Sequence, residues 1–269
     1  MAEKSEDTEI SQFYQWIREY WAELSKSPEG ELSHFLNFGV WQDDTENLYD
    51  AQEIFRQLVI KALGELNKEQ IGLEVGCGIG GFAVKLVREQ RLKLVCLDML
   101  KEHLELSSEY AQQEKVEDNI EFQLGNSMMM SSLADNTFDF AYCLESSFHY
   151  PDKQQFFNEI HRVLKPGATF IIADITCNDN SKITFKQGNF FPSTKEFKYY
   201  MTKAGFHLVN HERVGMQVFR PLVEFLKEYN NQKHLRNKLT KYWERVLSNY
   251  AELCEQSLMD YEIYHLSRP

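Results

Sequence analysis

An alternation of short apolar runs and amphipathic stretches begins at residue 71, and it constrains this 269-residue chain more than any other feature. Five of the runs are expected to be strands: 71–75, 92–97, 120–124, 138–144 and 169–175. Apolar residues with helical spacing occur between them in 82–87, 104–111 and 156–164, and the last of these stretches stops at Lys165-Pro-Gly167. Strands that alternate with helices predict parallel pairs joined by right-handed crossovers, so the sequence predicts an α/β fold.

Further elements are expected on both sides of this region. Apolar spacings of three and four predict helices over 8–25 and 46–65. After the alternating region, Ser193 or Thr194 is expected to cap a helix to Ala204, with a strand over 206–214, helices within 218–257 and a terminal strand over 259–266. We therefore expect an N-terminal helical cap segment over 1–66 and a core over 67–269, which carries a helical lid insertion at about 216–257.

Composition limits the partners and the compartment. The chain has 29 Lys and Arg against 41 Asp and Glu, a formal net charge of −12, which disfavours binding to nucleic-acid phosphates. No apolar run approaches the roughly 20 residues that span a bilayer, and the first residues lack the apolar core of a signal peptide. The five cysteines form no CxxC pair, so neither a disulfide framework nor a metal site is indicated. We expect a cytoplasmic monomer or homodimer with no nucleic-acid partner and no membrane span.

A glycine-rich loop, Leu73-Glu-Val-Gly-Cys-Gly-Ile-Gly-Gly81, connects the first expected strand to a helix. Glycine permits positive φ and a close approach of the backbone to a ligand, and the N–H groups of the following helix favour an electron-rich group. Two ligand classes compete, because the loop satisfies both the dinucleotide pattern GxGxxG and an acidic-x-GxGxG pattern. Glu74 would repel a pyrophosphate, whereas it suits a cofactor that bears a cationic amine and a sulfonium. Asp98, at the end of the next strand, is placed to bind both hydroxyls of a ribose.

The order of motifs from Leu73 to Ile175 resembles that of the class I S-adenosylmethionine (SAM)-dependent methyltransferases. The glycine loop resembles the first motif of that family, and Asp98 matches its ribose-binding acidic residue. Asn126 stands where the family often has an Asp that binds the adenine amino group. Residues 135–140 resemble the family's entry to its fourth strand, and residues 162–167 resemble its "RVLKPGG" turn. About 100 residues match in the right order, which makes the joint match far more specific than the glycine loop alone.

This resemblance implies a Rossmann-like, doubly wound, seven-stranded sheet of order 3-2-1-4-5-7-6, with strand seven antiparallel. It implies SAM as the cofactor and S-adenosylhomocysteine (SAH) as its product. The implied cofactor-binding residues are Glu74, Gly76, Cys77, Gly78, Gly80, Asp98, Met99, Asn126, Ser127, Met128 and Leu144.

Two further segments resemble the small-molecule subgroup of that family. Residues 37–41 resemble its "HFGYW" segment, and residues 145–152 resemble the "ESLHHMPD" segment of natural-product sugar O-methyltransferases such as the rebeccamycin enzyme. Tocopherol, sterol, isoprenoid and phosphobase methyltransferases belong to the same subgroup. The resemblance implies a small-molecule acceptor, and the implied acceptor or lid residues are Tyr14, Tyr20, Trp41, Glu145 and Tyr150.

Transfer of a methyl group to a hydroxyl requires that a proton be removed, because a protonated alcohol is a poor nucleophile. His149 follows the fourth expected strand and Asp174 ends the fifth, so both should lie at the carboxyl edge of the sheet, where ligands bind in open α/β folds. We expect His149 to be the general base and Asp174 to orient it or share its proton. The structural alternative is that His149 lines the pocket without titrating and that Asp174 caps its strand.

Other functions stay open at this stage. A carbon acceptor (an isoprenoid or quinol) or a nitrogen acceptor (a phosphobase) needs no such base. A basic cluster within 233–245 would draw in an anionic acceptor if it faced the pocket, although such a run is more often a solvated helix face. Outside the methyltransferases, the same loop suits an NAD-dependent oxidoreductase, and a module that has kept the fold without its chemistry is the non-enzymatic alternative.

Overall fold

A seven-stranded sheet forms the centre of the computed structural model, which describes residues 18–27, 29–183, 188–234 and 238–269. Its strands are β1 (Ile71–Val75), β2 (Lys93–Asp98), β3 (Ile120–Leu124), β4 (Phe138–Leu144), β5 (Leu164–Cys177), β6 (His207–Arg213) and β7 (Met259–Ser267). The order is β3-β2-β1-β4-β5-β7-β6, in which the first five strands are mutually parallel and β7 runs antiparallel to both of its neighbours. The predicted α/β class, strand order and antiparallel seventh strand are therefore confirmed.

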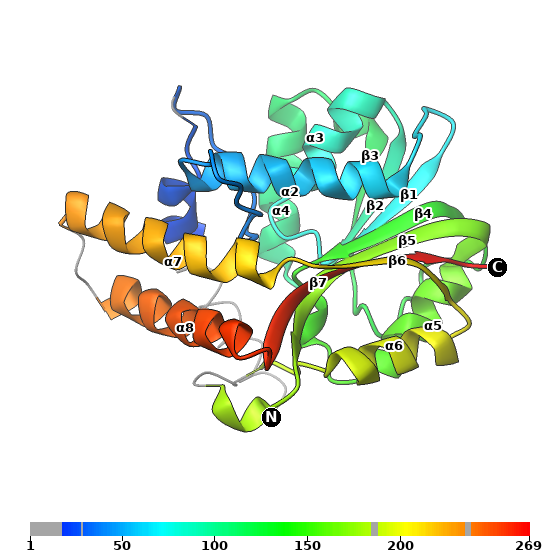
Figure 1. Ribbon diagram of the computed structural model, residues 1–269. Coiled ribbons are helices and arrows are strands. Elements are labelled where there is room, and N and C mark those ends of the chain that lie inside the picture. Colours follow the sequence, from blue (N-terminus) through cyan, green and yellow to red (C-terminus); the bar gives the residue numbers. More distant parts are fainter. Residues whose placement is uncertain (1–17, 28, 184–187, 235–237) are drawn as a thin grey trace, which may run out of the picture.

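Helices cover both faces of the sheet (Figure 1). One face carries α2 (Leu48–Leu63), α3 (Gly81–Gln90) and α4 (Lys101–Gln113), and the other carries α5 (Lys153–Val163) and α6 (Thr194–Lys203). The last two helices, α7 (Gly215–Gln232) and α8 (Lys238–Glu255), pack side by side and extend beyond the sheet next to the start of β7. They stand between β6 and β7 in the chain, where the helical insertion is predicted, whereas its role as a lid and the domain boundary at residue 66 stay predictions.

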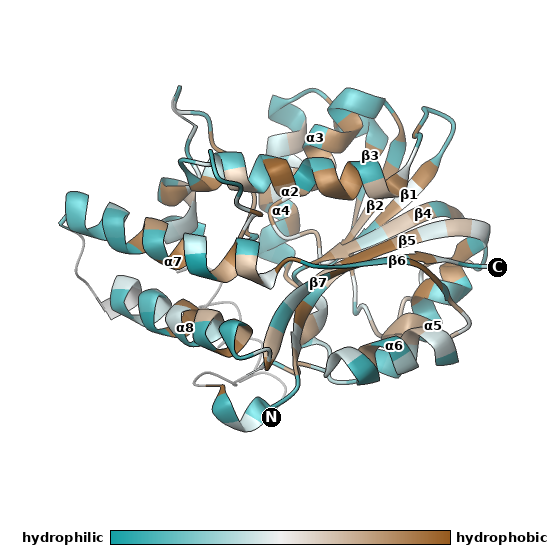
Figure 2. Ribbon diagram, in the orientation of Figure 1, coloured by the Kyte–Doolittle hydropathy of each residue, from teal (hydrophilic) through white to brown (hydrophobic). Residues whose placement is uncertain are grey.

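The alternation of side chains along each strand builds two apolar layers. Leu73 and Val75 of β1 belong to the layer that includes Phe156 and Phe157 of α5, whereas Tyr142 of β4 belongs to the layer under α2 and α3. Figure 2 shows the apolar residues gathered on the strands and on the inner sides of the helices. Because the central strands β1, β4 and β5 are largely buried on both faces, the ends of these strands are where polar groups can meet a ligand.

The predicted helix ends are mostly correct. Ser193 caps α6 through a capping box with Glu196, as its sequence suggests. The segment Lys165-Pro-Gly167 ends α5 at Val163 but does not form a separate turn, because β5 begins at Leu164 and runs through it. Gly167 takes a φ of +83° within this stretch, and the β4–β5 register shifts between Phe138 and Phe140.

Among the helices that the structure describes, none is both long and apolar enough to cross a membrane.

Candidate functional site

A cavity of about 300 Å³ lies at the carboxyl edge of the sheet, a volume at the lower end of the range for small-molecule sites. The segments that follow β1, β2, β3 and β4 supply its base, from Gly76–Gly78, Asp98–Leu100, Asn126–Met128 and Leu144–Pro151. Residues 34–38 and α8 supply further walls. The predicted segments after four different strands are thus brought to one place.

The glycine loop enters α3 through three residues with positive φ, which are Gly76 at +74°, Gly78 at +54° and Gly80 at +80°. The Gly76 N–H donates to the Leu97 carbonyl oxygen at 2.7 Å, which fixes the loop to the end of β2. Gly80 is the N-cap of α3. Of the three glycines predicted to bind the cofactor, it alone is absent from the described lining of the cavity. Its role is therefore to start the helix, while Gly76 and Gly78 line the cavity.

Asp98 lies next to the glycine loop and lines the cavity. Its Oδ2 accepts a hydrogen bond from the Gly78 N–H at 2.9 Å, and its Oδ1 accepts one from the Leu100 N–H at 2.9 Å. Each carboxylate oxygen has a second lone pair, so both oxygens keep capacity for the hydroxyls of a ribose. The backbone bonds hold the carboxylate in one orientation for such a ligand.

Glu74 is the last residue but one of β1 and is only 4% exposed. Its Oε2 accepts from the Tyr142 hydroxyl at 3.1 Å, with Cys96 Sγ at 3.9 Å, while Oε1 has no hydrogen-bond partner among the described residues. Burial raises the pKa of the Glu74 carboxyl to about 8, and the nearby Asp98 carboxylate acts in the same direction. A positively charged ligand group in the cavity would oppose this shift and stabilise the ionised carboxylate.

The segment after β3 closes the base of the cavity. Asn126 Oδ1 accepts from the Met128 N–H at 2.8 Å, which folds the segment into a tight turn. Ser127 donates to the Tyr150 hydroxyl at 3.0 Å, and that hydroxyl also bonds to Ser146 at 3.0 Å. These bonds connect the segments after β3 and β4, and the amide of Asn126 remains at the cavity wall.

This donor set fits SAM. The cofactor would bring a sulfonium and an ammonium group to a cavity that holds the carboxyl groups of Glu74 and Asp98. Gly76 and Gly78 leave backbone surface, instead of side chains, where the loop meets the cavity. Glu74, Gly78, Asp98 and Asn126 are the residues that would hold it, and the roles of the predicted cofactor-binding residues stay predictions.

Residues 33–38, the wall segment, cross the open side of the glycine loop. The carbonyl oxygen of His34 comes so close to Gly81 that a Cβ there would lie 2.2 Å from it. From the other side, Gln52 of α2 donates to the Asn37 carbonyl oxygen at 2.8 Å and accepts from the Ser33 hydroxyl at 2.7 Å. The wall segment is therefore held between α2 and the start of α3.

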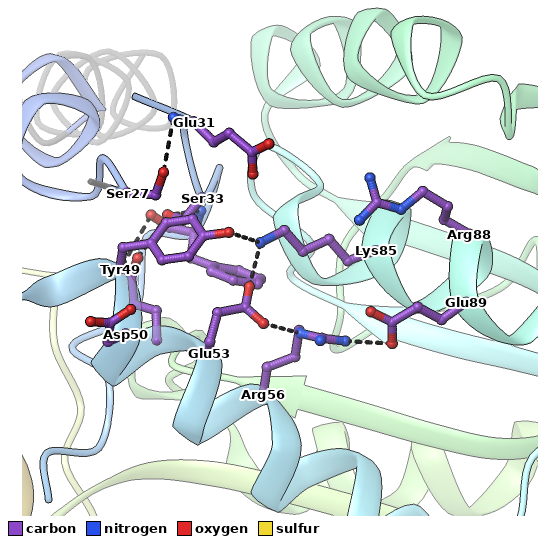
Figure 3. A network of polar contacts seen from close by, with 12 residues as sticks. Ser27, Glu31, Ser33, Tyr49, Asp50, Glu53, Arg56, Lys85, Arg88 and Glu89 are labelled. Carbon is purple, nitrogen blue, oxygen red and sulfur yellow. Dashed lines mark hydrogen bonds and ion pairs between the residues drawn. The ribbon is translucent and has the colours of Figure 1, made fainter. Parts of the chain in front are cut away.

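A network of charged groups joins the same two helices (Figure 3). The buried Lys85 of α3 pairs with Glu53 of α2 and lies over the rings of Phe35 and Tyr49, at 4.9 and 4.8 Å from their centres. Arg56 bonds to Glu53 at 2.7 Å and to Glu89 of α3 at 2.8 Å. Because Phe35 belongs to the wall segment, this network fixes the cavity wall as well as the helix pair.

His149 lines the cavity at the end of a 3-10 turn (Ser147–His149) that follows β4. Its Nδ1 lies 2.9 Å from the Gly188 carbonyl oxygen. Burial lowers the pKa of the imidazole to about 4, so the ring is neutral at physiological pH. A carbonyl oxygen only accepts, which assigns the hydrogen to Nδ1 and the lone pair of the neutral ring to Nε2.

Asp174 lies behind this turn and is absent from the described cavity wall. Its carboxylate accepts from the Ser147 hydroxyl, from the Phe148 N–H at 2.9 Å and from the Ile175 N–H at 2.7 Å. Burial raises the pKa of this carboxyl to about 6. These bonds hold the backbone turn that carries His149, and the predicted role of Asp174 in orienting the imidazole or sharing its proton stays a prediction.

The predicted acceptor and lid residues divide into two groups. Glu145 and Tyr150 line the cavity. Tyr20 and Trp41 are absent from its described lining: Tyr20 donates to Asn230 of α7 at 2.9 Å, and the ring of Trp41 packs on Phe225 of α7 at 5.2 Å. Both residues therefore attach the N-terminal segments to α7, and Tyr14 lies outside the described residues.

Several lining residues are missing from the predicted set. From α8 these are Trp243, Val246 and Tyr250, and from other segments they include Trp21, His34, Phe38, His103, Phe148 and Phe191. The spacing of the α8 residues, i, i+3 and i+7, predicts one apolar helix face. That face could be predicted, but whether it meets the protein core or a cavity depends on the tertiary structure.

The chain is similar in sequence to methyltransferases. Residues 73–172 match the family described as "Methyltransferase domain". The chain is 28% identical over 173 residues to Methyltransferase GfsG of Streptomyces halstedii, a match that covers 64% of this chain and 62% of that protein. It is 30% identical over 142 residues to the erythromycin 3''-O-methyltransferase of Saccharopolyspora erythraea, covering 52% of this chain and 46% of that protein. The chain thus spans about half the length of the curated relatives it matches.

A solved structure extends the similarity to the whole fold. The geranyl diphosphate C-methyltransferase from Streptomyces coelicolor A3(2), solved with SAH, matches with a TM-score of 0.74 over 96% of this chain and 98% of that chain. The sequences are 14% identical, so this likeness concerns the fold alone.

Proposed function

Because residues 73–172 match a methyltransferase domain family, we propose that this chain uses SAM and transfers its methyl group to a hydroxyl oxygen of a small-molecule acceptor. SAM, when bound, supplies an activated methyl group on a sulfonium, which leaves the protein to position the acceptor, exclude water and remove a proton. The observation that carries the choice of oxygen is the placement of a neutral imidazole, His149, at the cavity wall.

We assign the general base to His149. The Gly188 carbonyl oxygen holds the Nδ1 hydrogen, so Nε2 is the atom that would take the hydroxyl proton of the acceptor. The low pKa keeps this nitrogen unprotonated at physiological pH, although it also makes the imidazole a weaker base than an exposed histidine. The proton removed from the hydroxyl would need to pass on to solvent after each turnover.

Asp174 acts in this proposal as a positioning residue. Its bonds to Ser147 and to the Phe148 N–H fix the turn immediately before His149. Loss of the carboxylate would move the imidazole, and a displacement of about 1 Å can cost roughly 100-fold in rate. The predicted sharing of a proton between the two residues is not needed for this role.

The test uses the full-length protein with methyl-labelled SAM and a panel of phenols and polycyclic alcohols. His149→Ala should bind SAH within about twofold of the wild-type Kd and should lower methyl transfer by roughly 100-fold or more, the contribution typical of a general base. His161→Ala is the matched control, since His161 packs against Phe206 on the far helix layer and is absent from the described cavity wall.

Full transfer to oxygen by His149→Ala would overturn the base assignment, and labelled product at carbon or nitrogen would overturn the choice of oxygen. The domain assignment has its own test, because SAH should bind at micromolar Kd in a calorimeter whereas NAD should not. Binding of NAD in place of SAH would favour the oxidoreductase alternative.

A further inference from the structure

The part of the cavity around His149 has walls built mainly from aromatic rings. Phe148 packs on Phe191 with ring centres 5.9 Å apart, and Phe191 packs on Tyr250 of α8 at 6.1 Å. On a second side, Trp21 contacts Trp243 of α8 at 5.3 Å and Phe38 at 6.1 Å. All six rings belong to cavity-lining residues, and we call this set, Trp21, Phe38, Phe148, Phe191, Trp243 and Tyr250, the aromatic chamber.

The charged residues of the cavity wall carry one sign. Glu74, Asp98 and Glu145 line it, and no lysine or arginine is found among its described lining residues. The ammonium group of Lys153, which follows β4, donates instead to the Tyr150 carbonyl oxygen at 2.6 Å. In the basic cluster, Lys241 and Arg245 of α8 are exposed and face away from the lining residues of that helix.

Glu145 places a carboxyl group in the cavity wall beside the aromatic chamber. Its Oε1 accepts from the Phe38 N–H and from the Tyr261 hydroxyl, both at 2.9 Å, so two bonds fix this side chain next to the Phe38 backbone. Its Oε2 has no hydrogen-bond partner among the described residues. Burial raises the pKa of this carboxyl to about 8. In its protonated form the carboxyl can hydrogen-bond to an uncharged ligand, and in its ionised form it would repel an anion.

We propose that the aromatic chamber binds an uncharged, mainly apolar acceptor and discriminates against acceptors that bear a phosphate, sulfate or carboxylate. The proposal rests on the proposed function, which it deepens by naming the acceptor class. Aromatic faces favour ring systems and hydrocarbon skeletons. A buried anion without a paired cation is costly, so the chamber excludes the anionic acceptors, phosphobases among them, that the sequence left open.

Matched pairs of probes test the charge of the acceptor. Each pair shares one skeleton: 2-naphthol with 2-naphthyl phosphate, geraniol with geranyl diphosphate, and estradiol with estradiol 3-sulfate. Titrated into the SAH-loaded protein at pH 7, the neutral member of at least one pair should bind with a Kd at least tenfold lower than that of its anionic partner. Tighter binding of an anionic member in any pair, or no binding by any neutral member, overturns the proposal.

Variants of α8 test the location. Tyr250→Leu and Trp243→Leu should each raise the Kd of the neutral probe at least fivefold while the Kd of SAH changes less than twofold. Tyr199→Ala on α6 is the matched control, because it also removes a tyrosine ring but from a side chain that is 58% exposed. Unchanged affinity for the neutral probe in both α8 variants would overturn the chamber as its binding site.

The SAH measurement separates the two levels of the inference. If the wild type binds SAH but binds the anionic probes more tightly than their neutral partners, the proposed methyl transfer stands and the proposed acceptor class is wrong. If the wild type fails to bind SAH, the proposed function fails first, independently of the probes.

Discussion

Gly76 and Ser146 touch across the base of the cavity, and a Cβ on Gly76 would lie 2.3 Å from the Ser146 hydroxyl oxygen. Ser146 donates in turn to the Val75 carbonyl oxygen at 3.1 Å. The ends of β1 and β4 are therefore in contact at a residue of the glycine loop that has both a positive φ and no room for a side chain.

Gly76→Ala should weaken SAH binding at least tenfold, because the added methyl must displace Ser146 or the loop. Gly30→Ala is the matched control: Gly30 also has a positive φ, +89°, but a Cβ there meets nothing within 4 Å. Both variants should lose about 1 kcal/mol of unfolding free energy to the strained backbone, and only Gly76→Ala should lose affinity. Calorimetry and urea unfolding measure the two effects, and equal SAH affinity in the two variants would contradict the proposed role of Gly76.

The affinity for SAM should rise with pH between 6 and 8. Glu74 has a pKa of about 8 in the ligand-free protein, so its carboxyl is mostly protonated at pH 6, and the cationic cofactor favours the ionised form. Binding must therefore release a proton at low pH, and the Kd should fall at least tenfold from pH 6 to pH 8. Calorimetry in buffers of different ionisation enthalpy measures both the Kd and the proton release.

Glu74→Gln is the control for this pH dependence, because it cannot ionise. Its Kd for SAM should vary less than threefold over the same pH interval. A wild-type Kd that rises with pH, or a variant that keeps the full dependence, would show that another group governs binding.

Asp98→Asn should lower the affinity for SAH by roughly 10- to 100-fold. A hydrogen bond to a charged group contributes about 1.5–3 kcal/mol, and the amide can no longer accept through both side-chain atoms. Asp139→Asn offers a close comparison, since Asp139 also accepts from a backbone N–H, that of Ile71 at 2.9 Å, but at the opposite end of β1. If both substitutions leave the SAH affinity unchanged, Asp98 does not bind the cofactor.

Glu53→Gln should destabilise the fold by about 1–3 kcal/mol. The change leaves the buried Lys85 and Arg56 without their shared carboxylate, and unpaired buried polar groups are costly. Glu105→Gln is the control, because Glu105 pairs with Lys101 on the exposed surface of α4, where such pairs contribute less than about 1 kcal/mol. Urea unfolding compares the two, and equal midpoints would mean that the network does not hold α2 on α3.

Sequence reasoning predicted the parts of the site that follow strands. The glycine loop, Asp98 and His149 could be placed because each ends or follows an apolar run, and the carboxyl ends of parallel strands share one edge of the sheet. The position of Asn126 was predicted from the family resemblance. Tyr20 and Trp41 are absent from the described cavity lining and attach to α7 through Asn230 and Phe225, so their predicted acceptor or lid role stays a prediction. An aromatic residue in a helical or irregular segment carries no local signal of the partner against which it packs.

Local pattern therefore determined the α/β class and the strand-end segments that build the base of the cavity, since these depend on periodicity, glycine geometry and chain order. The strand order was predicted from the resemblance to a known family. Only the tertiary structure decided how the cavity is closed. It brings Phe38 against Glu145 across 107 residues of sequence and turns Trp243 and Tyr250 of α8 into the cavity wall. The physical reason is that burial depends on contacts between distant segments: the same apolar helix face can meet the core or a ligand, and the same carboxylate can be exposed or buried with a raised pKa.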